Sequence, residues 1–366
     1  MRSLLATSIV VAGCASRADA AALNRLRMCP PFNHWHPVAI DGKNVLMGWE
    51  TSREPVAGGP VRLSIVHLPS TRLVPVPRSS YPRRTFLGFW QIDWPWIVGI
   101  AYTTPLPAFP ANWQLWAGNV VTGRHVILDN YRAHRHPVAE FFPQFALNGG
   151  RVVWEYSTNQ PMAVNSFPAQ GIAMEDLATH RRTFLTAPDP DVVDERITFS
   201  GTRIVWESAG ATRKTSAVDL WMYELQSHTL TRLSRNTSSA DSSLYPRLSG
   251  RYLLFEQGPN GSDSGTPYLV DLGTKTGAAS PRWWQAYRFR QLGRNGLTNT
   301  QMGDGLVSWD DWRLLDVTRS RVWFNRYWTV IAIAGRMVLV GHMNMETGHE
   351  TYAAWQIPAA CTAPGF

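Results

Sequence analysis

One short theme recurs along this chain and constrains its fold more than any other feature. Each copy is a short strand, a glycine-centred turn, and an apolar strand that ends in an aromatic residue and a carboxylate. The copies read PVAIDGKNVLMGWE, PQFALNGGRVVWE, ERITFSGTRIVWE, PRLSGRYLLFE and TQMGDGLVSWD, at residues 37–50, 143–155, 195–207, 246–256 and 300–310. Self-similarity with a period of about 50 residues is typical of solenoids, propellers and other repeat arrays.

Each repeat continues with a third strand, a polar turn and a short fourth strand. The third-strand ends align at residues 176–179, 224–227 and 271–274. Four short antiparallel strands in each unit of about 50 residues describe a propeller blade. Two divergent copies, at residues 89–102 and 331–342, complete the set. The sequence therefore predicts an all-β protein, a β-propeller with seven four-stranded blades.

The last copy has no evident fourth strand. We expect the N-terminal segment, residues 23–32, to supply it and to close the ring. Six blades is the alternative, if the short sixth and seventh copies merge into one.

The first 22 residues have the composition of an export signal. Arg2 is followed by an apolar core and by the small residues Ala18-Asp19-Ala20, which suit a cleavage site. In a second interpretation, residues 11–14 (VAGC) form a lipobox and Cys14 is lipidated. Both predict an exported propeller spanning residues 23–366, which would be periplasmic, an outer-membrane lipoprotein or secreted. Contact with a membrane would come only through the lipid anchor.

The other two cysteines, Cys29 and Cys361, lie near the two ends of the mature chain. Export favours oxidation of thiols. The termini of a closed ring must meet, so we predict a disulfide between these two residues. The alternative is a pair of free thiols at frayed ends.

The chain is basic, with 35 lysines and arginines against 27 acidic residues and a net charge of +8. In an exported protein this balance favours anionic polymers of the envelope or its surroundings over nucleic acid. Structural pairs of arginine and carboxylate, together with the base composition of the genome, explain the same excess without any ligand.

The repeat resembles the TolB-type β-propellers of bacterial envelopes. The resemblance is strongest in residues 142–186 and 195–234, which share a pattern of P-x-hydrophobic-S-G-x-R-hydrophobic-V-W-E followed by D-L-x-T. It extends over roughly residues 36–358 and implies the architecture, while propellers of one architecture perform many functions. TolB carries a further domain ahead of its propeller, and here the repeats begin soon after the leader, so TolB's own role is not carried over.

The repeated carboxylates and aromatic residues end the second strand of their blades. We expect the carboxylates to lie in a ring near one face, where they would bind cations or serve the framework. Because this residue type recurs in most blades, a structural role is favoured. In that role the carboxylate pairs with an arginine or caps a turn of the neighbouring blade. The carboxylates are Glu50, Glu155, Glu207, Glu256 and Asp310. The aromatic residues before them are expected to pack between blades.

Histidines outside the repeat form a candidate metal site. His34 and His36 are two residues apart on an extended segment, so their side chains point the same way. Closure of the ring would bring them near His342 and Glu50. Imidazoles with a carboxylate suit a divalent transition metal. Hydrogen-bonded or exposed loop histidines are the alternative.

A basic and aromatic stretch joins the fifth and sixth blades. It contains Trp283, Trp284, Arg288 and Arg290. Aromatic faces beside guanidinium groups can bind sugars or anionic polymers. A fourth strand with an arginine-rich loop explains the same residues equally well.

These observations lead to two hypotheses on function. The sequence contains no G-x-S-x-G, P-loop or H-E-x-x-H motif. We therefore favour a non-enzymatic, monomeric propeller that binds an envelope protein or an anionic glycan through its loop-rich face, using His34, Trp35, His36 and the basic aromatic stretch. The alternative is a metal-dependent carbohydrate-active enzyme, either a polysaccharide lyase or a glycoside hydrolase.

Overall fold

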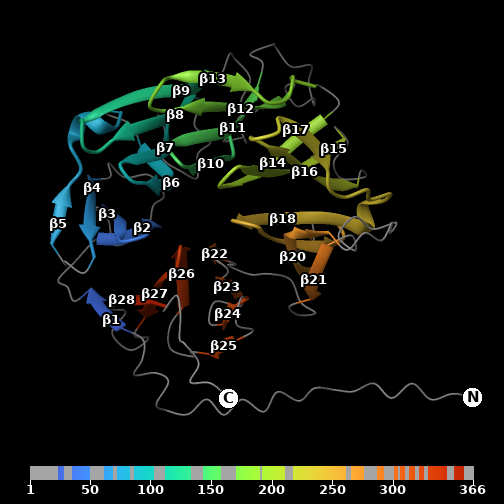
Figure 1. The fold of residues 1–366 in the computed structure, drawn as a ribbon. Helices are drawn as coiled ribbons and strands as arrows, with labels where there is room; N and C mark the ends of the chain where they lie inside the picture. Colours follow the sequence, from blue (N-terminus) through green and yellow to red (C-terminus); the bar gives the residue numbers. More distant parts are fainter. Residues whose placement is uncertain are drawn as a thin grey trace, which may run out of the picture.

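The computed structural model describes most of the repeat region. The described residues are 24–28, 35–49, 62–68, 72–82, 86–102, 112–132, 143–157, 170–189, 192–210, 217–260, 265–275, 287–291, 301–303, 306–309, 313–317, 321–324, 329–343 and 350–357. They form seven four-stranded antiparallel sheets arranged as blades around a central axis (Figure 1). The prediction of a seven-bladed β-propeller is confirmed, and the six-blade alternative is excluded.

The first six blades follow one rule, in which consecutive strands lie side by side and the first strand is innermost (Figure 1). Blade 1 contains β2 (Trp35–Asp41), β3 (Asn44–Trp49), β4 (Arg62–His67) and β5 (Leu73–Pro75). Blade 2 contains β6 (Phe86–Asp93), β7 (Trp96–Tyr102), β8 (Asn112–Asn119) and β9 (Arg124–Arg132). Blade 3 contains β10 (Phe145–Asn148), β11 (Arg151–Ser157), β12 (Gln170–Asp176) and β13 (Arg181–Phe184).

The next three blades have the same strand order. Blade 4 contains β14 (Val192–Ser200), β15 (Arg203–Gly210), β16 (Val218–Glu224) and β17 (Thr229–Arg232). Blade 5 contains β18 (Ser242–Ser249), β19 (Tyr252–Gly258), β20 (Thr266–Lys275) and β21 (Tyr287–Gln291). Blade 6 contains β22 (Gln301–Gly303), β23 (Leu306–Trp309), β24 (Arg313–Asp316) and β25 (Arg321–Phe324).

Blade 7 joins the two ends of the chain. It contains β26 (Thr329–Ala334), β27 (Met337–Met343) and β28 (Glu350–Gln356), and its outermost strand is β1 (Asn24–Met28). β1 runs antiparallel to β28, with Asn24 opposite Gln356. The predicted closure by the N-terminal segment is therefore confirmed. The leader, Cys14, Cys29 and Cys361 lie outside the described residues, so the signal, the lipidation and the disulfide stay predictions.

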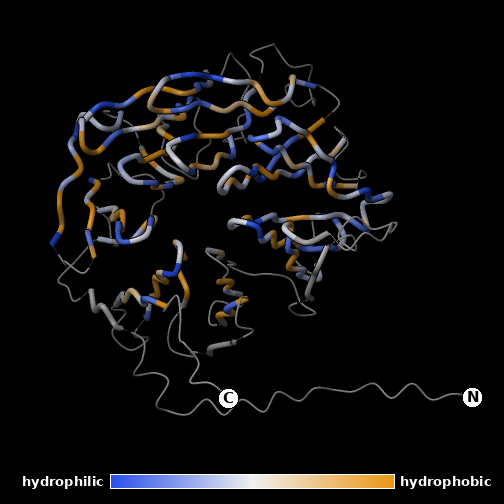
Figure 2. Tube along the Cα trace, in the orientation of Figure 1, coloured by the Kyte–Doolittle hydropathy of each residue, from blue (hydrophilic) through white to orange (hydrophobic). Residues whose placement is uncertain are grey.

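The hydrophobic core is divided among the interfaces between blades. Each of the seven interfaces holds a cluster of buried apolar side chains from the two facing sheets, and the interface between blades 4 and 5 holds a second, smaller one. Figure 2 shows the apolar segments distributed around the ring in the same way. Trp154, Trp206 and Phe255 are almost completely buried and share clusters with residues of the preceding blade. The repeated aromatic residues are therefore inter-blade packing, as predicted.

A repeated ion pair explains why an arginine follows the glycine turn in three blades. The arginine at or just before the start of the second strand forms an ion pair with an acidic residue of the third strand in the same blade. These pairs are Arg151–Asp176 at 3.6 Å, Arg203–Glu224 at 2.9 Å and Arg251–Asp271 at 2.7 Å. Some of the arginines that make the chain basic therefore have a structural role within the blades.

The two rims of the ring differ in their connections. In every blade, two residues separate the first strand from the second, as residues 42–43 do in blade 1. We call the rim with these turns the short-turn rim. The opposite, loop-rich rim carries the longer connections between second and third strands, such as residues 50–61 and 158–169, many of which lie outside the described residues. In the described part of the chain, no helix has the length and apolar character to cross a membrane.

Candidate functional site

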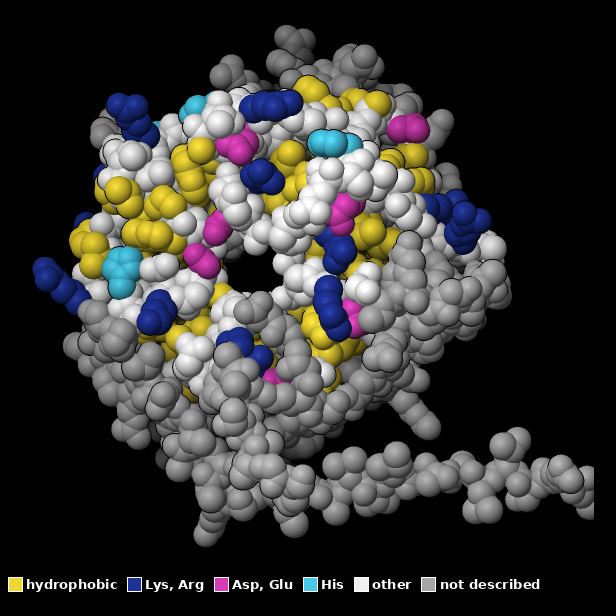
Figure 3. Space-filling model, in the orientation of Figure 1, with side chains coloured by type: hydrophobic (Ala, Val, Ile, Leu, Met, Phe, Trp, Pro, Cys, Tyr) yellow, Lys and Arg dark blue, Asp and Glu magenta, His cyan; other side chains and the backbone are white. Residues whose placement is uncertain are grey.

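A channel passes through the centre of the ring, and Figure 3 shows its opening with acidic and basic side chains at the edge. Near the short-turn rim lies a cavity of about 530 Å³, lined by the ends of the seven innermost strands. Since one strand from each blade contributes, residues far apart in the sequence meet around a single space.

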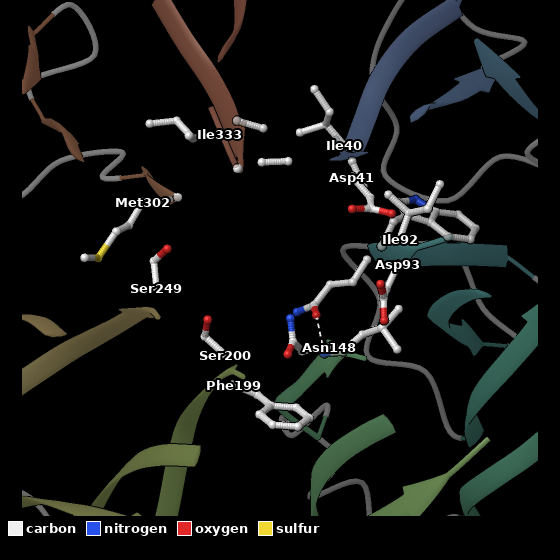
Figure 4. A pocket seen from close by; sticks show the side chains of 18 of the residues that line it. Ile40, Asp41, Ile92, Asp93, Asn148, Phe199, Ser200, Ser249, Met302 and Ile333 are labelled. Carbon is white, nitrogen blue, oxygen red and sulfur yellow. Dashed lines mark hydrogen bonds between the residues drawn. The ribbon is translucent and has the colours of Figure 1, made fainter. Parts of the chain in front are cut away.

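Polar and apolar side chains alternate around the wall of this cavity (Figure 4). Asp41 and Asp93 lie next to each other, whereas Met302 and Ile333 lie on the opposite side. In blades 1 to 5 the residue just before the two-residue turn bears an oxygen acceptor. These residues are Asp41, Asp93, Asn148, Ser200 and Ser249.

The acceptors before the turns connect neighbouring blades. In four consecutive cases the side chain accepts a hydrogen bond from a backbone N–H in the turn of the next blade. The bonds run from Trp94 N to Asp41 Oδ2 (2.7 Å), Gly150 N to Asp93 Oδ2 (2.6 Å), Gly201 N to Asn148 Oδ1 (2.8 Å) and Gly250 N to Ser200 Oγ (2.8 Å). This series satisfies turn amides that face the channel and fixes the stagger of the blades.

The acidic pair of this series is electrostatically coupled. Burial raises the pKa of Asp41, and the charge of Asp93 raises it further, while the hydrogen bond from the Trp94 N–H opposes the rise. Within the described residues, no group of three or more histidine, cysteine or acidic side chains is arranged to hold a metal ion. The four acceptors that bond the turn of the next blade serve the framework.

The innermost strands bulge midway along the channel wall. The register shifts between Gly88 and Gln91 in β6, and equivalent shifts occur in β14 and β18. Within these bulges Phe89, Arg196 and Tyr245 have positive φ values of 55°, 52° and 57°. Such backbone costs about 1–3 kcal/mol for a residue other than glycine and persists only where the surroundings enforce it.

Glu207 enforces two of these conformations. Both of its carboxylate oxygens accept hydrogen bonds from Arg196 Nη1, at 3.0 and 3.1 Å, and Oε1 also accepts one from the Tyr245 N–H of the next blade at 2.6 Å. Burial raises the pKa of Glu207, and the Arg196 guanidinium counteracts this rise. Glu207 pairs with an arginine and holds the neighbouring blade, which confirms the framework interpretation for this residue.

The other described members of the predicted carboxylate ring are also internal. Glu155 and Glu256 are 2% and 1% exposed. Glu155 Oε2 accepts a hydrogen bond from the Gln144 N–H at 3.2 Å. Glu50 and Asp310 lie outside the described residues. The three described carboxylates therefore do not form an exposed ring that would attract cations.

The predicted metal ligands are only partly described. His34 and Glu50 lie outside the described residues, and the side chain of His36, in β2, is not described. His342 is half-buried in β27, opposite Thr351 of β28. Blades 1 and 7 are neighbours, with apolar residues of both in one cluster. The metal site stays a prediction. It required blades 1 and 7 to be neighbours, and they are.

The predicted binding residues fall in two regions. Trp35 begins β2 and packs half-buried against the cluster between blades 1 and 7. Arg288 and Arg290 belong to β21, the outermost strand of blade 5, as the fourth-strand interpretation predicts. Their side chains, and all of Trp283 and Trp284, are outside the described structure.

Sequence reasoning missed the residues that line the channel wall. The acceptors before the turns, such as Asp41 and Asp93, occupy one position of the repeat, so alignment of the copies would have found them. Arg196, Tyr245 and Arg247 carry no such pattern, because a bulge changes the register locally and leaves no mark in the strand periodicity.

Comparison with known proteins supports the architecture. No family model matches the sequence, and no curated protein matches it. A prolyl endopeptidase structure aligns with a TM-score of 0.58 and 12% identity over 94% of this chain. The alignment covers 54% of that protein, so this chain spans about half its length.

Two other solved structures match over nearly their whole length. An oligogalacturonate lyase in complex with manganese aligns at a TM-score of 0.54 and 12% identity, covering 91% of this chain and 93% of the lyase. The β-propeller domain of the Trilobed protease from Pyrococcus furiosus, described as having an open velcro topology, aligns at a TM-score of 0.54 and 9% identity, covering 89% of this chain and 96% of that domain. At these identities the likeness shows the propeller fold alone, and the TolB-type family stays a prediction.

Proposed function

We propose that this protein is an exported β-propeller that binds a partner, a protein or a glycan, through its loop-rich rim and catalyses no reaction. The observation that carries the proposal is the structural difference between the two rims. The short-turn rim is occupied by inter-blade hydrogen bonds, while the variable, longer connections are gathered on the other rim. Binding residues are disproportionately found on loops that a rigid scaffold positions.

The described acidic residues of the interior support a binding role. Glu207 is held by Arg196 and by the backbone of the next blade. Asp129 accepts a hydrogen bond from Trp154 Nε1 at 3.0 Å. These groups stabilise the blades and their interfaces, and a general acid or base would need a group free to exchange a proton with a substrate.

The test is partner capture with matched tryptophan variants. The immobilised protein is exposed to an envelope extract and to a glycan array, and the bound species are quantified for Trp283→Ala with Trp284→Ala and for Trp94→Ala. Trp94 is 38% exposed in the turn between β6 and β7, on the opposite rim. We expect capture to fall several-fold in the double variant and to be unchanged in Trp94→Ala. Equal capture by all three proteins would contradict the proposal.

A second candidate function is a metal-dependent carbohydrate-active enzyme. Its support is the match to the manganese complex of oligogalacturonate lyase, which extends over 93% of that protein. The predicted ligands His34, His36, His342 and Glu50 would hold a divalent metal between blades 1 and 7. Elemental analysis of the purified protein and of His342→Ala tests it. One equivalent of metal, lost in the variant, favours the enzyme, and its absence in both favours the binding protein.

A further inference from the structure

Arg247 is an arginine on the wall of the central channel with uncommitted donors. Among the described residues, its guanidinium makes one hydrogen bond, from Nη1 to the carbonyl oxygen of Pro246 at 3.2 Å. The nearby carboxylate of Glu207 is already held by Arg196. Among the described residues, no carboxylate lies within ion-pair distance of Arg247. A guanidinium offers five N–H donors, so most of those of Arg247 are available to a ligand.

Solvent reaches Arg247 through the channel. The residue is exposed and lies in β18, the innermost strand of blade 5, which is bordered on its outer side by β19 and on its faces by the neighbouring blades (Figure 1). The protein around it still displaces much of the water, which lowers the pKa of the guanidinium, while the Glu207 charge opposes this effect. Charge-assisted hydrogen bonds from a guanidinium to an anion are stronger than hydrogen bonds between neutral groups.

The surrounding charges add to the attraction for an anion. Arg196 lies beside Arg247, is 30% exposed, and stacks its guanidinium over the Tyr245 ring at 4.0 Å. Two guanidinium groups thus face one carboxylate, that of Glu207. Glu195, which precedes Arg196 in β14, is engaged in an interaction of its own. The cluster of these arginines with Glu207 and Tyr245 therefore offers more positive than negative charge to the channel.

The cluster is also held in place before any ligand arrives. Arg196 and Tyr245 both have strained positive φ values, and Glu207 fixes them through the Arg196 side chain and the Tyr245 amide. Strained backbone of this kind gathers at binding and catalytic sites. A site that is already ordered loses little entropy when it binds, which raises its affinity.

We infer that Arg247 and Arg196 form a carboxylate-binding site for an acidic glycan, a proposal that rests on the partner-binding function given above. Phe89, which is 52% exposed, occupies the equivalent bulge in the innermost strand of blade 2 and adds an aromatic side chain there. Sugars stack on aromatic faces, and their carboxylates form bidentate pairs with arginine. The site lies on the innermost strand of blade 5, which an extended glycan chain would reach more readily than the surface of a folded protein would.

The experiment measures binding of short oligomers of galacturonate, mannuronate and guluronate by calorimetry, each beside its methyl ester. The proteins are the full-length wild type, Arg247→Gln and the control Arg181→Gln. Arg181 is exposed on β13, the outermost strand of blade 3, so its replacement removes the same charge far from the channel. Thermal unfolding checks that Arg247→Gln is folded, which we expect because its side chain makes one local hydrogen bond.

We expect at least one acidic oligomer to bind the wild type, the ester to bind much more weakly, and Arg247→Gln to lose about tenfold or more in affinity. Arg181→Gln should bind as the wild type does. No binding of any oligomer, equal binding of acid and ester, or unchanged affinity in Arg247→Gln overturns the proposal. Binding of hexaglutamate in place of the glycans also overturns it, in favour of an acidic peptide. Partner capture with the Trp283 and Trp284 variants is read separately, so a failure of this site is distinguished from a failure of the proposed partner-binding function.

Discussion

Asp194 makes the stability of this propeller depend on pH in an unusual direction. The residue lies in β14 and is 5% exposed. Burial raises its pKa from 3.8 to about 6, and the charge of Asp189 adds to the rise, while hydrogen bonds from the Ser208 and Trp206 side chains oppose it. Since the folded state holds this proton more tightly than the unfolded chain, the contribution of Asp194 to stability is full below pH 3.8 and is lost as the pH rises through 6.

The size of the effect follows from the two pKa values. One pKa unit corresponds to about 1.4 kcal/mol, so the loss approaches roughly 3 kcal/mol well above pH 6, and about half of it falls between pH 5 and pH 7. The substitution Asp194→Asn removes the charge and keeps one oxygen acceptor for Ser208 or Trp206. Relative to the wild type, the variant should therefore be about 1.3 kcal/mol more stable at pH 7 than at pH 5.

The assay is urea unfolding at pH 5 and pH 7, followed by tryptophan fluorescence. Asp176→Asn serves as the control with the opposite sign, because hydrogen bonds from Thr179 and Ala178 outweigh burial and lower the pKa of Asp176. The stability contributed by Asp176 is lost as the pH falls below 4, so its variant should show no change in relative stability between pH 5 and pH 7. A difference between Asp194→Asn and the wild type that is the same at both pH values, or larger at pH 5, would refute the reasoning.

Three further predictions concern the framework. Deleting residues 24–28 removes the outermost strand of blade 7 and should lower the melting temperature in calorimetry, and an unchanged temperature would exclude β1 as the closure. Trp154→Ala should cost about 3–5 kcal/mol in denaturant unfolding, because the indole is completely buried between blades, and a cost below 1 kcal/mol would contradict that packing. Gly118→Ala should abolish soluble expression, because its Cβ would lie 1.8 Å from the Ser80 carbonyl oxygen. Gly201→Ala, at φ +61° with open space, should cost only about 1–2 kcal/mol and remain soluble.

Much of the candidate site could not be predicted from the sequence. Glu207 was correctly assigned to the framework because carboxylates recur at that position, yet its contact with Tyr245 depends on how blade 5 is staggered against blade 4. Arg247 looked like any other arginine of a basic chain. Its exposure on the innermost strand, and the absence of a carboxylate partner for it in the described part of the chain, follow only from the position of neighbouring groups in space.

The sequence by itself determined the architecture: seven blades, the turn between the first and second strands, and closure by the N-terminal strand. These features are local or periodic, since a strand alternates, a turn needs glycine or a comparable residue, and a repeat recurs at a fixed interval. Only the tertiary structure decided which side chains meet across the interfaces and the channel. A β-bulge moves a side chain without altering composition, and contacts between blades about 50 residues apart depend on the stagger of two sheets.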